Sequence, residues 1–325
     1  MPTNFFDLIT EGVSVPLTTL ASGYKPQGLI GESVFPVVKS VTKGGKIPIF
    51  GKDAFKVYET LRARGAHSNR AQMEADSWIT FFCEEHDLVI PLDARELNEL
   101  NNLPVSDEMK LKALFNLQDR QRRRVQWNLK LELEKVIADQ VQSTASYASS
   151  NRLALTTSDC WSETGSDPVS QIEAAREIIR GKIGVYPNTL IMGADAYAQL
   201  KFHAAYTDKL KLTSDKVVRP DLIAQLHDLK RVIIGLSMGL DSAGAFYDLW
   251  SDNAILCYIP DTGTPDIDEP SFGYTIKPGF SPTPYPYVDI FTEEGGKIVN
   301  VRCTDMYDTL MIMANAGYLI SNCKK

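Results

Sequence analysis

The sequence is poor in the residues that build disulfide frameworks, metal sites and histidine-based catalytic centres. It has five cysteines, which are widely separated and form no Cys-x-x-Cys pair, and only four histidines. Disulfide-stabilised and zinc-binding domains place these residues in even numbers or at close, regular spacings. We therefore expect free thiols in a reducing compartment, and neither a metal nor a cofactor.

Long apolar runs and an excess of positive charge are also absent. No window approaches about 18 uninterrupted apolar residues, so we expect no membrane span. The N-terminal residues lack the basic and apolar stretches of a signal peptide. The formal net charge is −7, and proteins that wrap nucleic acid by charge alone are basic. Any contact with DNA must therefore come from a local basic patch.

The chain has enough hydrophobic residues for a large core, and its N-terminal segment is typical of an extended arm. Hydrophobic residues make up 44% of the 325 residues, which argues against wholesale disorder. Residues 1–45 carry few helical signals. Within them, Tyr24–Val38 is punctuated by two prolines and two glycines, a pattern typical of extended chain lying on other structure.

A long hairpin is predicted next. Lys46–Tyr58 and Trp78–Leu92 are rich in β-forming residues, and the polar segment between them contains Arg62, Arg64 and Arg70. Two such stretches with a polar tip predict antiparallel strands. An isolated hairpin is marginally stable in water, so we expect this one to pack on something else.

A very long helix follows the hairpin. Ser106 is a suitable N-cap, Asp107 and Glu108 lie in the first turn, and no glycine or proline occurs in Val105–Val141. Apolar residues recur every three or four positions, so one stripe faces a core. About 35 residues at 1.5 Å each span roughly 50 Å, far more than an ordinary three-turn helix.

The remaining sequence predicts a mixed α/β region and a terminal strand pair. After a linker rich in Ser and Thr, Asp167 and Pro168 open a second helix. Short strands and helices then alternate as far as Pro260. The stretch from there to Pro286 is rich in Pro and Gly and predicts irregular chain. The C-terminus predicts two strands about a turn near Asp305.

One motif has the form of a catalytic nucleophile. Residues 235–239, GLSMG, match the Gly-x-Ser-x-Gly elbow of hydrolases around Ser237. Such an elbow needs a helix directly after the serine and a histidine further along the chain. The residues that follow form a poor helix, and all four histidines precede Ser237. We interpret the motif as a strand followed by a glycine-rich turn, with a serine hydrolase as the alternative.

Two further motifs lack what their chemistry needs. Glu84–Asp87, EEHD, has metal-ligand residue types, but neighbours on a strand point to opposite faces and no second histidine cluster completes a site. The two GGK stretches lack the flanking residues of a phosphate-binding loop. We therefore predict no catalytic, cofactor-binding or metal-ligating residues.

A cluster of arginines occupies the middle of the long helix. Arg120, Arg123 and Arg124 fall near one side of the helix, and Arg122 interrupts the apolar stripe. The cluster is either a solvated face with salt bridges or a patch that contacts another subunit or DNA phosphates. Arginine suits both partners because it pairs bidentately with carboxylates and phosphates. We take these four and the three arginines of the hairpin tip as candidate contact residues.

The order of these elements resembles the major capsid protein of tailed double-stranded DNA bacteriophages, which has the Hong Kong 97-type capsid fold. Similar stretches are YKPQGLIGESVFPVV, KIPIFGKDAF, YPNTLIMGADAYAQLKFH, FYDLWSDNAILCYIP and PSFGYTIKPG. The resemblance spans nearly the whole chain and implies an α+β fold. The implied regions are an N-arm (1–45), an E-loop hairpin (46–92), a P-domain (93–170) with a spine helix (106–143), a mixed α/β A-domain (171–289) and C-terminal strands (290–325) returning to the P-domain.

The resemblance also implies a function. The protein would be a structural subunit, not an enzyme, that self-assembles into pentamers and hexamers of an icosahedral head around double-stranded DNA. It would be assembled in the host bacterial cytoplasm with scaffolding and portal proteins, and would reside in the virion capsid. The arm begins near Met1, which favours a separate scaffolding protein. Lys52 and Lys56 lie in the loop without surroundings that would drive covalent cross-linking, so we expect a non-covalent shell. An encapsulin-like compartment shell, which shares the fold, is the alternative.

Overall fold

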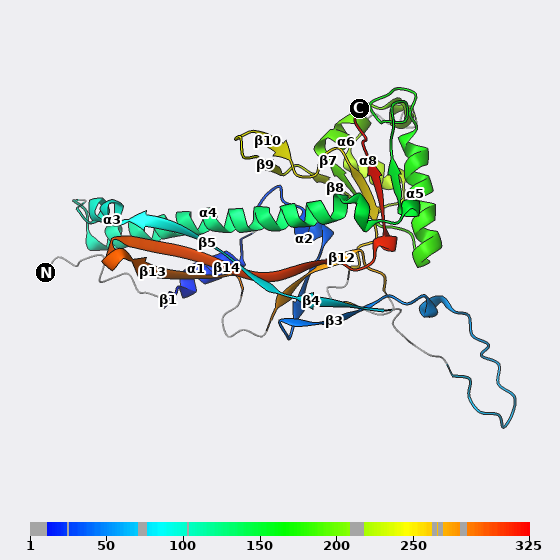
Figure 1. The fold of residues 1–325 in the computed structure, drawn as a ribbon, viewed down its shortest axis with the longest axis horizontal. Coiled ribbons are helices and arrows are strands. Elements are labelled where there is room, and N and C mark those ends of the chain that lie inside the picture. Colours follow the sequence, from blue (N-terminus) through cyan, green and yellow to red (C-terminus); the bar gives the residue numbers. More distant parts are fainter. Residues whose placement is uncertain are drawn as a thin grey trace.

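The computed structural model describes residues 12–24, 26–70, 77–102, 104–208, 218–261, 265, 269–279 and 285–325. Figure 1 shows a long helix lying along a sheet, a compact α/β lobe at one end of that helix, and hairpins that leave the body on opposite sides. The architecture is therefore a mixed α+β fold with three clusters of buried hydrophobic residues and several projections.

The long helix α4 (Asp107–Gln142) has 36 residues and spans about 54 Å. The Ser106 hydroxyl accepts a hydrogen bond from the Met109 amide at 3.5 Å, so the expected cap and helix are confirmed. One half of α4 packs on the extended sheet and the other half on the lobe. Its buried apolar side chains are Leu114, Val125, Leu129, Leu133, Ile137, Ala138 and Val141.

The sheet under α4 has six strands built around β14. Strand β14 pairs antiparallel with β5, β13 and β12, while β1 extends the sheet beyond β13 and β2 runs parallel to β12. The strands are β1 (Gly12–Val13), β2 (Val37–Ser40), β5 (Glu84–Asp93), β12 (Gly273–Pro278), β13 (Tyr287–Glu293) and β14 (Ile298–Met311).

Two sequence-based expectations are wrong in this sheet. No turn occurs at Asp305, because β14 runs through it for 14 residues. The Asp305 carboxylate is buried, but it accepts from Lys277 Nζ at 2.7 Å, which offsets the cost of placing it in a strand. The segment up to Pro286 is not wholly irregular, because it contains β12. Gly273 opens that strand where Phe35 leaves no room for a side chain.

The lobe contains the second sheet, in the order β6-β15-β11-β7-β8. Asp167 caps helix α5 by accepting from the Ser170 amide at 3.2 Å, as the sequence predicts. The last strand, β15, joins this sheet beside β11 and β6, whereas β14 lies on the sheet under α4. The elements are β6 (Arg152–Ala154), α5 (Pro168–Ile183), β7 (Thr189–Gly193), α6 (Ala194–Leu200), α7 (Ala204–Thr207), α8 (Pro220–Leu226), β8 (Arg231–Gly235), β11 (Ala254–Cys257) and β15 (Gly317–Ser321).

The N-terminal arm is more helical than its composition suggests. Helix α1 (Val15–Ser22) starts with a proline in its first turn and buries Leu17 and Ala21 in the core beneath α4. The arm then passes through the short helix α2 (Gly31–Val34) before it reaches β2. The expectation of a purely extended arm is therefore wrong, because tertiary packing stabilises a helix that sequence alone does not signal.

The expected hairpin is present but shorter than predicted. Strand β3 (Gly44–Ile49) pairs antiparallel with β4 (Ser77–Phe82). The chain between Tyr58 and Arg70 is exposed and carries no regular strand. The predicted second strand is divided at Cys83, since β5 leaves the hairpin and pairs with β14 instead. Helix α3 (Ala94–Asn101) connects β5 to the start of α4.

A second, smaller hairpin projects from the lobe. It consists of β9 (Met238–Leu240) and β10 (Phe246–Asp248), which pair antiparallel. The Asp241 carboxylate accepts hydrogen bonds from the Ala243 and Ala245 amides and so closes the turn. In Figure 1 this hairpin stands on one side of α4, and β3 and β4 lie on the other.

Candidate functional site

The Gly-x-Ser-x-Gly segment is a structural turn. Strand β8 ends at Gly235 and β9 follows directly, so no helix succeeds Ser237. A Cβ at Gly235 would lie 2.2 Å from Trp250 Cγ, and one at Gly239 would lie 2.7 Å from Tyr247 Cζ. Both glycines are thus required by close ring packing, and the interpretation as a strand followed by a glycine-rich turn is confirmed.

Glu134 of α4 is the partner of that serine and the centre of a buried junction. Its carboxylate accepts hydrogen bonds from Ser237 Oγ at 3.1 Å, Trp250 Nε1 at 2.7 Å, and the Ile30 and Gly31 amides at 3.0 and 2.5 Å. Donors that satisfy a buried carboxylate offset its desolvation. The junction therefore fastens the arm, the long helix and the lobe to one another.

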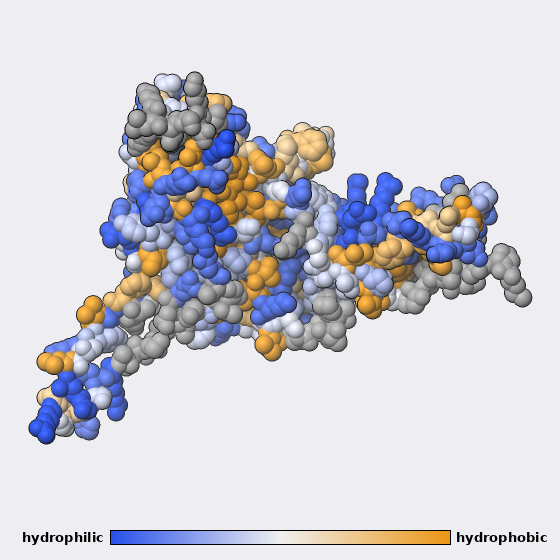
Figure 2. Space-filling model, turned by 180° about the vertical axis from the view of Figure 1, so that it is seen from behind, coloured by the Kyte–Doolittle hydropathy of each residue, from blue (hydrophilic) through white to orange (hydrophobic). Residues whose placement is uncertain are grey.

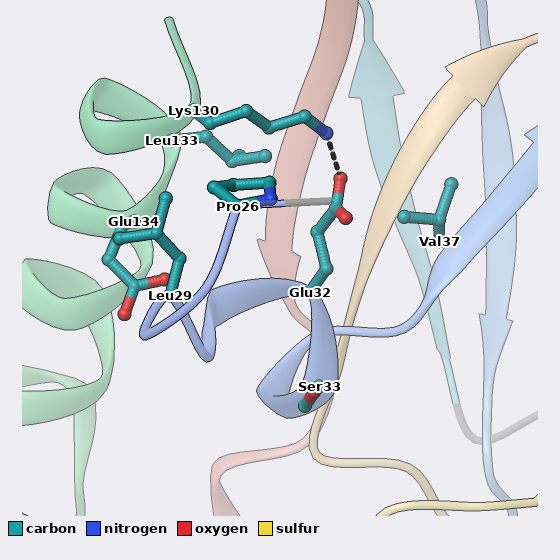
Figure 3. Close-up of a pocket in the computed structure, with 8 residues that line it drawn as sticks. All are labelled: Pro26, Leu29, Glu32, Ser33, Val37, Lys130, Leu133 and Glu134. Atoms are coloured by element: carbon teal, nitrogen blue, oxygen red, sulfur yellow. Dashed lines mark hydrogen bonds and ion pairs between the residues drawn. The ribbon is translucent and has the colours of Figure 1, made fainter. Parts of the chain in front are cut away.

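A pocket of about 510 Å³ opens beside this junction, between the arm and α4 (Figure 3). Lys130 reaches across it to form an ion pair with Glu32. Its two carboxylates are already engaged, Glu32 by Lys130 and Glu134 by the donors above, so the pocket offers no unpaired acid. The lining residues are Pro26, Leu29, Glu32, Ser33, Val37, Lys130, Leu133 and Glu134.

The arginine cluster of α4 divides into one buried and three exposed side chains. Arg122 is only 3% exposed, and its guanidinium binds Asp119 Oδ1 at 2.8 Å and Gln126 Oε1 at 2.7 Å. It also lies over the Tyr24 ring of the arm. Arg122 is thus occupied within its own chain, and we withdraw it from the candidate contact residues.

The three exposed arginines line a groove that sequence analysis did not anticipate. Arg120, Arg123 and Arg124 face the β9–β10 hairpin across a hollow of about 860 Å³. Arg123 is also paired with Asp119 Oδ2 at 3.1 Å. We call this hollow the α4 groove. Its lining residues are Arg120, Arg123, Arg124, Trp127, Asn128, Leu131, Met238, Leu240 and Phe246.

The other candidate arginines lie far from this groove. Arg62, Arg64 and Arg70 are all exposed in the tip of the long loop after β3. Figure 2, which views the molecule from behind, shows this tip as a mostly hydrophilic extension well separated from the body. The structure thus brings three of the seven predicted contact arginines together in the α4 groove and leaves three at the loop tip.

Three histidines, His86, His203 and His227, are engaged in packing and internal hydrogen bonds, whereas His67 is exposed in the loop tip. His86 stacks on Tyr307 with ring centroids 4.2 Å apart, and His203 Nε2 lies 3.1 Å from Ser166 Oγ. His227 Nε2 lies 2.8 Å from the Tyr206 hydroxyl. Among the described residues, no group of three metal-ligating side chains comes together, and no helix is long and apolar enough to span a membrane.

The cysteines are free thiols, and all five are buried. Burial raises the pKa of Cys303 to about 12, and burial with the nearby Asp308 carboxylate raises the pKa of Cys83 to about 11. Because the thiolate is the reactive form, these side chains are chemically inert at neutral pH. The expectation of thiols outside a disulfide framework agrees with this arrangement.

Comparison with known proteins decides the family. No family model matches the chain. The major capsid protein of Burkholderia phage BcepMu is 37% identical over 310 residues, which cover 94% of this chain and 94% of that protein. The chain belongs to the phage major capsid proteins. The resemblance stated from the sequence motifs is therefore confirmed.

Solved structures support the same fold for this major capsid protein. A phage-related protein from Bordetella bronchiseptica has a TM-score of 0.75 and 27% identity, covering 97% of this chain and 98% of that one. A candidate capsid protein of an E. coli CFT073 prophage has a TM-score of 0.59 at 12% identity, covering 96% and 99%. The latter likeness shows the fold alone, and the fold is the Hong Kong 97-type capsid fold expected from the sequence.

Only some residues of the α4 groove and of the buried junction of this major capsid protein can be recognised from its sequence. The arginines of the α4 groove are recognisable as a charge cluster. Its apolar wall is not, because the β9–β10 hairpin lies more than 100 residues further along the chain. Glu134 was also missed, since an isolated glutamate in a helix carries no signal of burial. An apolar neighbourhood on both sides, Leu133 and Ile137, is the only local hint.

Proposed function

We propose that this major capsid protein self-assembles into pentamers and hexamers that close an icosahedral head around double-stranded phage DNA. The observation that carries the proposal is the 37% identity to a phage major capsid protein over 94% of both chains. Physical support comes from the projecting hairpins, since exposed strands with apolar side chains are stabilised when copies of the chain cover them.

We also propose the regional division that the resemblance implies. The N-arm covers residues 1–45, the E-loop 46–92, the P-domain 93–170 with α4 as its spine, the A-domain 171–289, and the C-terminal strands 290–325. Two features favour adjustments within it. Strand β5 pairs with β14 for ten residues, so the E-loop proper ends near Cys83, and β15 belongs with the A-domain sheet.

The proposed partners follow from this role. Scaffolding and portal proteins would take part in assembly, and packaged DNA would meet the inner face of the shell. The loop-tip arginines Arg62, Arg64 and Arg70 are proposed to contact neighbouring subunits. Assembly would take place in the host bacterial cytoplasm, and the shell would be non-covalent. We propose no enzymatic activity, because the Ser237 hydroxyl is buried and donates to Glu134.

Electron microscopy of the purified protein tests the proposal. We expect rings and closed shells, and nuclease-resistant DNA inside particles recovered from phage-producing cells. A monomer that never assembles would contradict it. Particles that enclose protein cargo in the absence of a phage genome would favour the encapsulin-like alternative.

A serine variant tests the hydrolase alternative. Ser237→Ala removes one hydrogen bond to Glu134 and should leave assembly intact. An esterase activity that disappears in Ser237→Ala would support a hydrolase instead, with Ser166→Ala as the matched control for loss of another buried hydroxyl.

A further inference from the structure

The imidazole of His203 links three segments of the lobe and is almost completely buried. Its residue is only 6% exposed. It follows α6, occupies the N-cap position of α7 and contacts Ser166 in the loop that leads into α5. A histidine is the side chain whose charge changes between about pH 5 and 8. The contacts of its two ring nitrogens therefore decide whether this junction responds to pH.

The hydrogen bonds of His203 define where its proton lies. Nδ1 accepts from the Ala205 amide at 3.1 Å and so carries no hydrogen. Nε2 lies 3.1 Å from Ser166 Oγ and 3.2 Å from the Glu163 carbonyl oxygen. The Ser166 hydroxyl donates to that same carbonyl at 3.0 Å, so its oxygen is left to accept from Nε2. Only the neutral ring with its hydrogen on Nε2 satisfies all of these partners.

A second proton on the His203 ring would have no acceptor. It would lie on Nδ1 and point at the Ala205 N–H, which is itself a donor. The bond that caps the first turn of α7 would be lost. The ring would also carry a charge at a buried position, which is costly when no carboxylate is paired with it. Acid therefore acts on the contact that orients the start of α7.

The charged groups around His203 leave it without an ionic partner. Glu163 offers only its carbonyl oxygen, because its carboxylate pairs with Lys325 Nζ at 3.0 Å. Within the part of the chain that the structure describes, His203 forms no ion pair. The other charged or titratable groups on the surrounding segments are Asp167 and Glu173 of α5, Lys201 after α6, Tyr206 and Asp208 of α7 and its C-cap, and His227 after α8.

His227 holds the same helix in a way that tolerates a positive charge. Its Nε2 lies 2.8 Å from the Tyr206 hydroxyl, and its Nδ1 lies 2.5 Å from Glu173 Oε1. The carboxylate accepts from the Nδ1 hydrogen in either state. A hydroxyl can donate to Nε2 or accept from it. Charging His227 therefore keeps both hydrogen bonds, so the two histidines that hold α7 differ in their response to acid.

We propose that His203 is an acid-sensitive cap that releases the first turn of α7 when it is protonated. The neutral ring holds this turn against the loop before α5, and the charged ring does not. Phe202 directly precedes the cap and is 69% exposed, so the release changes the presentation of a large apolar side chain at the lobe surface. The inference goes beyond the proposed assembly, because all of its contacts lie within one chain.

Hydrogen exchange of the free subunit at pH 8 and pH 5 tests the cap. After correction for intrinsic exchange rates, we expect the protection of the α7 amides to fall about five- to tenfold at pH 5, the effect of losing one cap bond. The amides of β7 and β11 should keep their protection. Equal protection of α7 at the two pH values would overturn the proposal.

Two variants separate the histidines. In His203→Asn the side-chain oxygen can still accept from the Ala205 amide but does not titrate, so α7 should keep its protection at pH 5. His227→Gln is the matched control and should retain the wild-type pH dependence. The reverse pattern, or the same fall in His203→Asn as in wild type, would assign the response to other groups and refute the cap.

A measurement on the wild-type protein keeps the test open if a variant folds poorly. Nitrogen NMR of histidine-labelled subunit at pH 8 should show His203 with Nε2 protonated and Nδ1 unprotonated. The opposite tautomer, or a ring that is already doubly protonated at pH 8, would contradict the proposed cap.

Discussion

The lobe and the two hairpins of this protein differ in how far they bury their large apolar side chains. In the lobe, β7 and β11 bury every residue, and α5 together with the end of α4 covers their faces. In the hairpins, side chains as large as Trp78 and Phe246 remain mostly in water. The lobe buries both faces of its central strands within one chain, whereas each hairpin leaves one face exposed, although Ile47 and Phe81 on the other face of the β3–β4 hairpin are buried against the sheet.

The same contrast exists within a few residues of α4. Arg122 is enclosed by Asp119, Gln126 and the Tyr24 ring of the arm. Arg124, two positions later, faces the open groove. A cluster that looks uniform in sequence thus contains one residue that holds the subunit together and others that are available to a neighbour. The following predictions use such pairs to test the comparison.

The largest effect is expected for a matched pair of tryptophans. Trp250 is fully buried in the lobe and donates to Glu134, so Trp250→Ala should lower the free energy of unfolding by about 3–5 kcal/mol. Trp78→Ala should change it by less than about 0.5 kcal/mol, because Trp78 is exposed. Urea denaturation of the unassembled subunit measures both. Equal destabilisation would show that the hairpin is already part of a core.

The buried junction should be nearly as sensitive. Glu134→Ala leaves four donors without their acceptor, and we expect a loss of about 3 kcal/mol in unfolding free energy. Glu134→Gln should lose less, since its carbonyl still accepts. Asp139→Ala is the control on the same helix, because its ion pair with Lys135 is exposed. A Glu134→Ala variant as stable as the control would show that the junction contributes nothing.

A smaller effect is expected for the arginine pair. Arg122→Ala removes charge-assisted hydrogen bonds to Asp119 and Gln126, which should cost about 2 kcal/mol. Arg124→Ala should lie within about 0.5 kcal/mol of wild type in the free subunit. Thermal unfolding of both variants shows which arginine stabilises the free subunit. A loss of stability in Arg124→Ala but not in Arg122→Ala would contradict the stabilising role given to Arg122.

The effect that is smallest at neutral pH concerns the ionisation of a buried thiol. Burial raises the pKa of Cys303 from 9.0 to about 12. Above pH 9 the unfolded thiol loses its proton while the folded one keeps it, so the unfolded state binds fewer protons and stability falls as pH rises toward 12. Unfolding free energies of wild type and Cys303→Ala between pH 8 and 11 check this sign. A slope that is the same in both proteins would assign the loss to other groups.

Features governed by local chemistry were predictable from the sequence. Helix α4 can be predicted from Ser106 as its N-cap, from its acidic first turn and from the absence of glycine and proline. Helix α5 does the same through Asp167 and Pro168. In both cases the signal lies within a few residues of the element, and the cap bonds are present in the structure.

Features governed by distant contacts were not predictable. Asp305 suggests a turn, yet Lys277 neutralises it inside β14. Helix α1 is too short to form without the core that buries Leu17. The α4 groove is lined by both Trp127 and Phe246, and nothing in either segment specifies the other. The order of elements could be predicted from the sequence and indicated the family, but it did not specify these contacts.

The central claim is that the lobe is fully packed in the free subunit, whereas the exposed faces of the hairpins are covered only on assembly. Hydrogen exchange before and after assembly tests this claim most directly. We predict that amides of β4 and of the β9–β10 hairpin exchange quickly in the free subunit and at least about a hundredfold more slowly in shells, because assembly covers them. Amides of β7 and β11 should be equally protected in both states. Hairpins that are fully protected in the free subunit, or that stay unprotected in shells, would contradict the account.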